Sequence, residues 1–198
     1  MEVANFDVEY IDEIHTYLIN GVITPSVSEI IRFIYPNKYS DIPKSVLEEK
    51  ALFGTHVHNA IECYENQEDF ELTPREQLCF EQYLKLKEKY QIEVLEQETI
   101  IHYQDRFAGR LDMIATVQEQ EALIDIKTTS KLDYESLAWQ LGLYALGYEF
   151  LYGITFDEFY CLWLPKGHKG ELKQIVPKAK KEILEVLEEY EKQKNKSM

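Results

Sequence analysis

The chain has 198 residues, which is enough for one ordinary domain with a real hydrophobic core. Hydrophobic residues make up 45 % of it, which argues against an intrinsically disordered chain. The sequence has no apolar run of about eighteen residues, so no membrane-spanning helix is expected. The formal net charge of −15 opposes binding to a polyanion at long range, so a nucleic-acid partner requires a local basic region and bound cations.

Cysteine content and the first residues bear on the compartment. Cys63, Cys79 and Cys161 are far apart in the sequence and odd in number, so they offer neither a disulfide framework nor a Cys-x-x-Cys metal site. The segment Met1–Asn5 has no basic region followed by an apolar one, so no secretory signal is expected. We therefore expect a cytoplasmic protein without a membrane partner.

The N-terminal part predicts a hairpin followed by helices. Two short apolar segments, 15–19 and 22–23, flank Asn20-Gly21, the strongest two-residue turn signal. The remaining elements predicted here are a short helix opened by Thr24-Pro25-Ser26 that stops before Pro36, a helix over about 44–64, and a helix from Thr73-Pro74-Arg75-Glu76, a capping box, to about Tyr90.

The pattern then changes from helices to strands. Segments 92–103, 107–117 and 121–127 predict three consecutive strands, a helix follows over 134–150, a strand pair covers 157–164 and 171–176, and a last helix begins near Pro177. This order predicts an α/β fold in which helices flank a central mixed β-sheet. We expect a single domain over 1–198, with the hairpin and helices in 1–90, the catalytic core in about 53–176, and a C-terminal helix and tail in 177–198.

Two aspartates are predicted to face each other across the second and third strands. If the turn is centred between Gln118 and Glu119, Asp112 lies opposite Asp125, and Arg110 lies opposite Lys127. The other face then carries a uniformly apolar set, Leu111, Met113, Ala115, Ile124 and Ile126, which belongs in a core.

Opposed carboxylates on a half-buried strand pair are destabilising unless a cation lies between them. A hard ion such as Mg²⁺ or Mn²⁺ prefers such oxygen ligands. Lys127 points to the same face as Asp125, where an ammonium can orient water or neutralise charge on a phosphate. The structural alternative is an edge hairpin with solvated charges, which the apolar residues on both sides of each aspartate disfavour.

Three weaker signals surround this pair. On the second predicted helix, Gly54 and His58 share a face, whereas His56 and His58 diverge. A helical histidine taken alone is more often a packing or surface residue than a ligand. Glu98 lies opposite Asp112 if the loop 104–106 has three residues, whereas a two-residue loop puts Gln97 there, and the sequence leaves this open.

Residues suited to binding DNA occur later in the chain. Gln140 and Tyr144 share one helical face and could offer hydrogen bonds to a phosphate, although a tyrosine there is usually core. Segment 165–181 holds six lysines and His168 against a single acid. We assign part of the non-specific DNA contact to Lys166 and Lys169 in this segment.

Taken in order, the four motifs resemble those of the RecB-like nucleases of the PD-(D/E)XK superfamily. The motifs are Gly54…His58, Gly109-Arg110-Leu111-Asp112, Asp125-Ile126-Lys127-Thr128 and Gln140…Tyr144, which together span about residues 53–145. The opening hairpin followed by Thr24-Pro25-Ser26-Val27-Ser28 also resembles small phage-encoded exonucleases of this group.

The resemblance implies a restriction-endonuclease-like core and a role for each matched residue. It makes His58, Asp112, Asp125 and the Ile126 carbonyl ligands of Mg²⁺ or Mn²⁺, and Lys127 the catalytic lysine, with Asp112 and Asp125 as its acidic partners. It places Gln140, Tyr144 and Arg110 toward DNA. Some relatives carry a four-cysteine iron–sulfur cluster, which three scattered cysteines cannot build, so we expect none.

The predicted function is that of a metal-dependent deoxyribonuclease. We expect a phosphodiester hydrolase that leaves 5′-phosphates, an exonuclease of recombination, repair or phage DNA metabolism in a bacterial or phage-infected cell. It would act on single- or double-stranded DNA ends, with a helicase or single-strand annealing protein as a candidate partner. The alternatives are an inactive DNA-end-binding or accessory module of the same fold and an acidic protein that mimics nucleic acid, for which the net charge is the motive.

Overall fold

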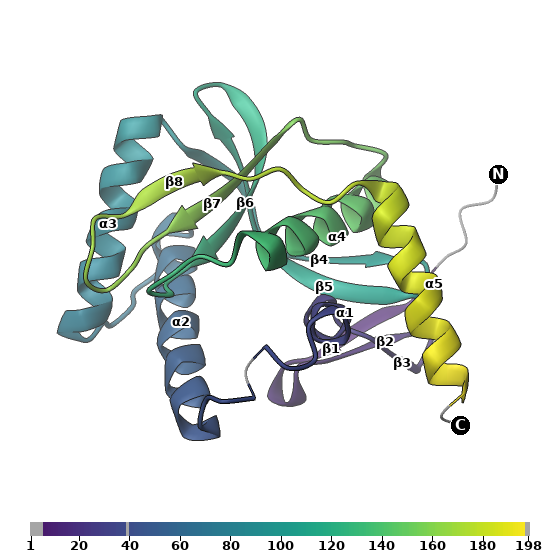
Figure 1. Ribbon diagram of the computed structural model, residues 1–198. Helices are drawn as coiled ribbons and strands as arrows, with labels where there is room; N and C mark the ends of the chain where they lie inside the picture. Colours follow the sequence, from purple (N-terminus) through teal and green to yellow (C-terminus); the bar gives the residue numbers. More distant parts are fainter. Residues whose placement is uncertain (1–5, 39, 197–198) are drawn as a thin grey trace.

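A computed structural model describes residues 6–38 and 40–196 (Figure 1). It is an α/β structure with a five-stranded sheet in the order β4-β5-β6-β7-β8 and a three-stranded sheet in the order β1-β2-β3. Within the large sheet β6 and β7 are parallel and the other neighbours are antiparallel, so the predicted mixed sheet is confirmed. Among the described residues no helix is long and apolar enough to cross a membrane.

The element bounds follow the predicted order closely. The N-terminal half contains β1 (Val8–Ile11), a 3₁₀ turn η1 (Asp12–Ile14), β2 (Thr16–Ile19), β3 (Val22–Thr24), α1 (Val27–Ile34), α2 (Lys44–Glu65) and α3 (Pro74–Tyr90). The rest contains β4 (Glu93–Tyr103), β5 (Phe107–Val117), β6 (Gln120–Lys127), α4 (Tyr134–Tyr152), β7 (Glu158–Trp163), β8 (Glu171–Gln174) and α5 (Lys180–Lys196).

The small N-terminal sheet contains one strand that the sequence analysis did not predict. The hairpin β2–β3 turns at Asn20-Gly21 as expected, and β1 adds to it with Val8 beside Ile19. The sheet packs against β5 through a small cluster formed by Tyr17, Ile19 and Ala108. Burial of this patch and the contact of Tyr10 with Arg110 of β5 help to hold the small sheet on the large one.

Local capping fixes the helix starts. Ser26 and Thr73 each accept a hydrogen bond from the backbone N–H three residues on, and Glu29 and Glu76 return the bond, so both helices begin with a capping box. The last helix begins at Lys180, three residues after the predicted Pro177. The intervening backbone is held as a loop because Lys178 N–H donates to the Ala138 carbonyl of α4.

The β4–β5–β6 meander has the predicted register. Val117 pairs with Gln120, so the turn consists of Gln118 and Glu119, and both have positive φ, as a type I′ hairpin requires. The loop before β5 has three residues, 104–106, because Tyr103 pairs with Phe107. These two turns together determine which side chains face the site.

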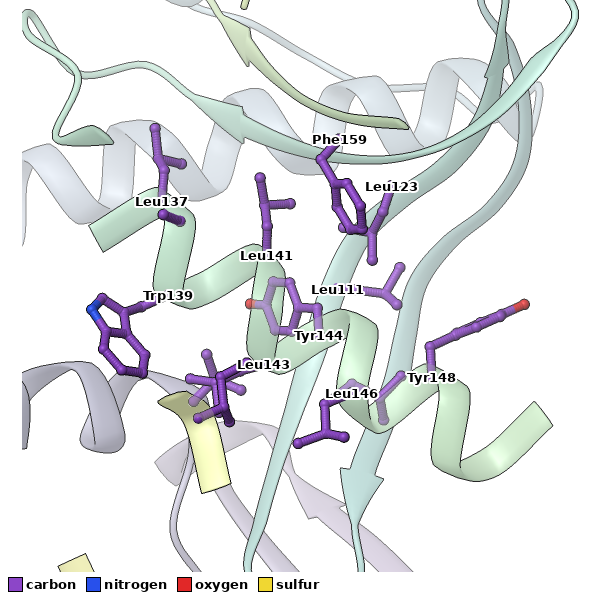
Figure 2. Close-up of a cluster of buried hydrophobic side chains, with 14 of the residues drawn as sticks. Leu111, Leu123, Leu137, Trp139, Leu141, Leu143, Tyr144, Leu146, Tyr148 and Phe159 are labelled. Atoms are coloured by element: carbon purple, nitrogen blue, oxygen red, sulfur yellow. The ribbon is translucent and has the colours of Figure 1, made fainter. Parts of the chain in front are cut away.

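Helix α4 crosses from β6 to the parallel strand β7 and is apolar nearly all round, because it is covered on several sides. Figure 2 shows Leu141 and Tyr144 of α4 beside Leu111, Leu123 and Phe159 of the sheet, within a core that also includes α1 and α5. Glycines in α4 let its neighbours approach: a Cβ added at position 147 would lie 2.6 Å from Ile101 Cδ1, and one added at position 142 would lie 2.8 Å from the Lys178 carbonyl oxygen.

The opposite face of the large sheet is covered by α2 and α3 (Figure 1). The residues predicted to line an apolar face are found here, namely Met113, Ala115, Ile124 and Ile126. Leu111 was expected with them, and that prediction is wrong: it packs in the core beneath α4. β5 separates from β6 beyond Met113, so the alternation of the paired region does not extend to Leu111.

Candidate metal centre and cleft

The candidate site lies where the large sheet splits. Pairing between β5 and β6 ends at Met113 and Ile124, while β5 continues beside β4 to Phe107 and β6 continues beside β7 to Lys127. Asp112 and Asp125 are the next residues after the last pair, in the register predicted from the turn. The two aspartates therefore stand at the mouth of a fork between strands that have parted.

Asp112 fills the gap that the fork creates. Its Oδ2 accepts the Ile126 backbone N–H at 2.7 Å, a donor that a paired strand would otherwise satisfy. Its Oδ1 lies 3.7 Å from His58 Nδ1 of α2. One carboxylate thus ties β5 to β6 while keeping an oxygen toward the histidine.

Glu98, His58 and Asp112 form a compact group of possible metal ligands. One ligand atom from each of them lies within 4.8 Å of the others. Glu98 rather than Gln97 takes the position opposite Asp112, because Gln97 pairs with Met113 and Thr99 with Leu111. Glu98 has φ 49°, a left-handed conformation that is uncommon for a non-glycine residue, which indicates a locally constrained backbone at this group.

Electrostatics at this group favour a cation. Burial and the charge of Asp112 raise the pKa of Glu98 to about 7, although Arg110 opposes the shift. Burial lowers the pKa of the His58 imidazole and outweighs the opposing charge of Asp112, so the ring is in the neutral form that binds metals. The two carboxyl groups, Glu98 and Asp112, repel each other across this small space unless a positive ion is bound.

A second part of the site is formed by Asp125, which is fully buried, and Lys127, which is partly exposed. The Asp125 side chain is 0 % exposed, and Lys127 Nζ lies 2.6 Å from its Oδ2. The direction of that contact does not satisfy hydrogen-bond geometry, and neither Asp125 oxygen has another hydrogen-bond partner among the described residues. Burial, followed by the charge of Asp112, raises the pKa of Asp125 to about 7, and Lys127 opposes this rise.

The charge on Lys127 is retained despite its surroundings. Burial alone would lower the pKa of its ammonium group, but the carboxylates of Asp125 and Asp112 together hold that pKa above its ordinary value.

Asp125 lies outside the compact ligand group of Glu98, His58 and Asp112. The sequence analysis had predicted Asp125 and Asp112 as equivalent ligands.

The two histidines of α2 point apart, as their spacing predicts. His58 Nε2 donates to the Ile126 carbonyl oxygen at 3.0 Å, so two of the predicted ligands contact each other. His56 Nδ1 lies 2.9 Å from Glu76 Oε1 of α3, away from the ligand group. Gly54 brings the start of the helix near Thr128, but an added Cβ would make only an ordinary contact of 3.5 Å, so space alone does not require glycine there.

Gly109 is required by close packing. A Cβ added there would lie 2.8 Å from Val27 Cγ2 and 3.0 Å from Tyr144 Cε1. Tyr144 lines the cleft described next, and its hydroxyl accepts a hydrogen bond from Gln140 Nε2 at 3.0 Å. The two auxiliary residues predicted from the sequence are therefore linked to each other, with Tyr144 at the surface of the cleft.

A cleft of about 900 Å³ leads to the ligand group. α2 lines one side, the small sheet and α1 line the other, and β5 contributes Arg110 and Asp112. Arg110 Nε lies 2.7 Å from Glu98 Oε2, and its guanidinium carbon lies 5.2 Å from the centroid of the Tyr10 ring. The sequence analysis missed Tyr10, because its contact with Arg110 joins residues far apart in the chain.

The basic segment 165–181 is mostly neutralised in the fold. Four of its six lysines form ion pairs with acids, namely Lys173, Lys178, Lys180 and Lys181. Lys166 and Lys169 have no ion pair among the described residues, and Lys166 Nζ lies 3.4 Å from the centroid of the Phe53 ring. Both lysines lie in the β7–β8 connection outside the cleft lining, so the segment is not the continuous basic region that its sequence suggested.

Comparisons with known proteins leave the function open. No family model and no curated protein matches the sequence. Among solved structures, one titled "Crystal structure of SSO0001" is similar with a TM-score of 0.46 and 17 % identity, over 83 % of this chain and 73 % of that chain. A likeness of this degree carries no argument about activity, so the case for a function rests on the site.

Proposed function

We propose that the protein is a divalent-metal-dependent deoxyribonuclease with a restriction-endonuclease-like core of the PD-(D/E)XK type. The observation that carries the proposal is the fork in the sheet. There ligand atoms of a histidine and two carboxylates lie within 4.8 Å of one another, and the buried Asp125 pairs with the partly exposed Lys127. Hydrolysis of a phosphodiester bond needs charge neutralisation and a positioned water. The candidate metal ligands and the Lys127 ammonium are groups that can supply both.

The residues fit Mg²⁺ or Mn²⁺. These ions prefer carboxylate and carbonyl oxygens, and Mn²⁺ also accepts imidazole. Glu98, Asp112 and His58 would hold the ion, and Asp125 and the Ile126 carbonyl, which accepts a hydrogen bond from His58, are the further ligands that we propose. Asp125 supports this fit, because Lys127 is the only group paired with its buried carboxylate among the described residues, and an ion would satisfy oxygens that have no hydrogen-bond partner there. A bound ion would offset charge on the phosphate and activate water for attack.

The protein's own residues supply the remaining requirements. Lys127 keeps its proton and stands at the open end of β6, where its ammonium can orient the attacking water and offset negative charge that develops on phosphorus. Arg110, Gln140 and Tyr144 offer donors toward a phosphate on the same side. We propose cleavage at DNA ends to leave 5′-phosphates, in recombination, repair or phage DNA metabolism.

The test is incubation of the full chain with end-labelled single- and double-stranded DNA in Mg²⁺, Mn²⁺, Ca²⁺ or excess EDTA. We expect cleavage with Mg²⁺ or Mn²⁺, little with Ca²⁺ and none with EDTA, and products that carry 5′-phosphates. Undiminished cleavage in EDTA would overturn the metal-dependent mechanism. DNA binding without cleavage under any metal would replace it with the inactive end-binding module.

A further inference from the structure

One side of the cleft exposes apolar and aromatic side chains. These are Tyr10, Ile14, His15 and Ile23 of the small sheet and its 3₁₀ turn, which we call the N-terminal wall. Ile14 is 63 % exposed and Ile23 is 68 % exposed, although both line a concave surface. Large apolar side chains left in contact with water in a cleft indicate a surface that a ligand covers.

The charges of the cleft do not suit recognition of a duplex through its backbone. Among the cleft-lining residues that the structure describes, the permanent cations are Arg32 and Arg110. The same lining contains five acids, Asp12, Glu29, Glu62, Glu98 and Asp112. Binding through the phosphate backbone needs a row of contacts from Lys and Arg, for a single strand as for a duplex, so affinity must come largely from contacts with the bases.

The N-terminal wall is continuous with the ligand group. Tyr10 is held from two sides: its hydroxyl lies 2.7 Å from His15 Nδ1, and its ring centroid lies 4.7 Å from that of Tyr17. Its ring lies beside the Arg110 guanidinium, and Arg110 contacts Glu98 of the ligand group. Arg110 thus connects the N-terminal wall to the ligand group, and both belong to one cleft.

We propose that the N-terminal wall binds the unstacked bases of a single-stranded DNA end and makes the protein selective for single strands. The inference rests on the proposed function and specifies its substrate. Aromatic rings stack on bases without regard to sequence, and isoleucine side chains insert between bases. In a duplex the base faces are covered by their neighbours, so the same insertion must first unstack them, which costs free energy that a single strand does not require. The cleft volume of about 900 Å³ is near the upper end of small-ligand sites, roughly 300–1,000 Å³, and suits a short stretch of one strand.

The test measures DNA affinity in Ca²⁺, which supports binding with little cleavage, by anisotropy of a labelled oligothymidylate and of a blunt duplex of equal length. The main variant is the double substitution Ile14→Ser and Ile23→Ser, which changes exposed side chains only. Ile154→Ser is the matched control, because Ile154 is also exposed, at 45 %, and lies outside the cleft lining. Tyr10→Ala and Tyr10→Phe separate ring stacking from the hydroxyl contact with His15.

We expect the parent to bind the single strand more tightly than the duplex. The double variant and Tyr10→Ala should each weaken single-strand binding on the order of 5- to 100-fold, Tyr10→Phe should weaken it less than Tyr10→Ala, and duplex binding and Ile154→Ser should stay close to the parent. The proposal is overturned if the double variant binds the single strand as the parent does, or loses affinity for both DNAs equally.

Cleavage assays in Mn²⁺ separate this inference from the nuclease proposal. If the wall variants lose single-strand affinity but the parent never cuts DNA, the nuclease proposal alone fails. If the parent cuts both DNAs and the wall variants behave as the parent, the wall proposal alone fails.

Discussion

The fork in the large sheet and the small N-terminal sheet are built by different means. The fork is held by β5 and β6, strands of 11 and 8 residues with hydrophobic cores on both faces. The small sheet has strands of 3 to 4 residues, one buried patch and exposed aliphatic side chains. The charged groups that must be positioned closely lie at the fork, on long strands that are packed on both faces. The exposed side chains proposed to contact bases lie on the short strands of the small sheet and on its 3₁₀ turn. The proposed chemistry and the proposed substrate selection divide along the same line.

Asp112→Asn should have the largest effect, and it acts on the fork alone. Asparagine keeps an oxygen for the Ile126 N–H but removes the charge that draws a cation. We expect Mn²⁺ affinity to collapse and cleavage to fall by about a thousandfold, since metal catalysis contributes several kcal/mol. The metal-free variant should be at least as stable as the parent, because repulsion with Glu98 and Asp125 is reduced. Asp105→Asn in the exposed β4–β5 turn is the control, and an equal loss there would point to a general defect.

The two histidines of α2 test whether position within one helix decides function. His58→Ala should weaken Mn²⁺ binding, measured calorimetrically, by at least about tenfold, as loss of a metal-site residue commonly does. His56→Ala removes only a partly exposed contact with Glu76 and should leave metal affinity unchanged. Similar effects of the two changes would remove His58 from the ligand group.

Gly109 and Gly54 differ in how much space their neighbours leave for a side chain, and alanine substitutions test that difference. Gly109→Ala places a methyl group against Val27 and Tyr144, so we expect a loss of about 1–3 kcal/mol in the free energy of unfolding and a disturbed Tyr144. Gly54→Ala makes only an ordinary contact with Thr128, and its helix position favours alanine, so stability should hold or rise. Urea denaturation of both variants gives the comparison, and a reversed order would contradict the packing described.

The smallest effect is expected in the β7–β8 connection, outside the cleft. Replacing Lys166 and Lys169 by alanine should weaken DNA binding modestly and flatten its salt dependence by roughly one unit of slope per lost phosphate contact. The measurement is DNA affinity in Ca²⁺ over a range of salt concentrations. An unchanged slope would remove this connection from the DNA path and leave the cleft as the contact surface.

The register at the fork followed from the sequence because local rules determine it. The turn at Gln118-Glu119 fixes the register in which Asp112 and Asp125 directly follow the last β5–β6 pair, and helical spacing separates His56 from His58. Glu98 stayed undecided because one residue of loop length shifts the register, and loop length has only a weak local signal.

Long-range contacts could not be predicted in the same way. Lys178 and Lys180 contributed to the basic segment 165–181 in the sequence, but they form ion pairs with Glu135 and Glu149 of α4 in the fold. The pairing of β1 with β2 and the contact of Tyr10 with Arg110 also depend on tertiary structure. Strand β1 is four residues long and gives little pattern by itself.

The central claim is that the fork performs hydrolysis, and Lys127→Ala tests it most directly. The parent and the variant are compared for cleavage rate in Mn²⁺ and for DNA affinity in Ca²⁺, with Lys127→Arg beside them. We expect the alanine variant to fold, to bind metal and to keep much of its DNA affinity, while turnover falls on the order of 10²–10³-fold. Arginine should not restore it fully, because a planar guanidinium presents a different geometry to water. Cleavage by Lys127→Ala at the rate of the parent would contradict the mechanism.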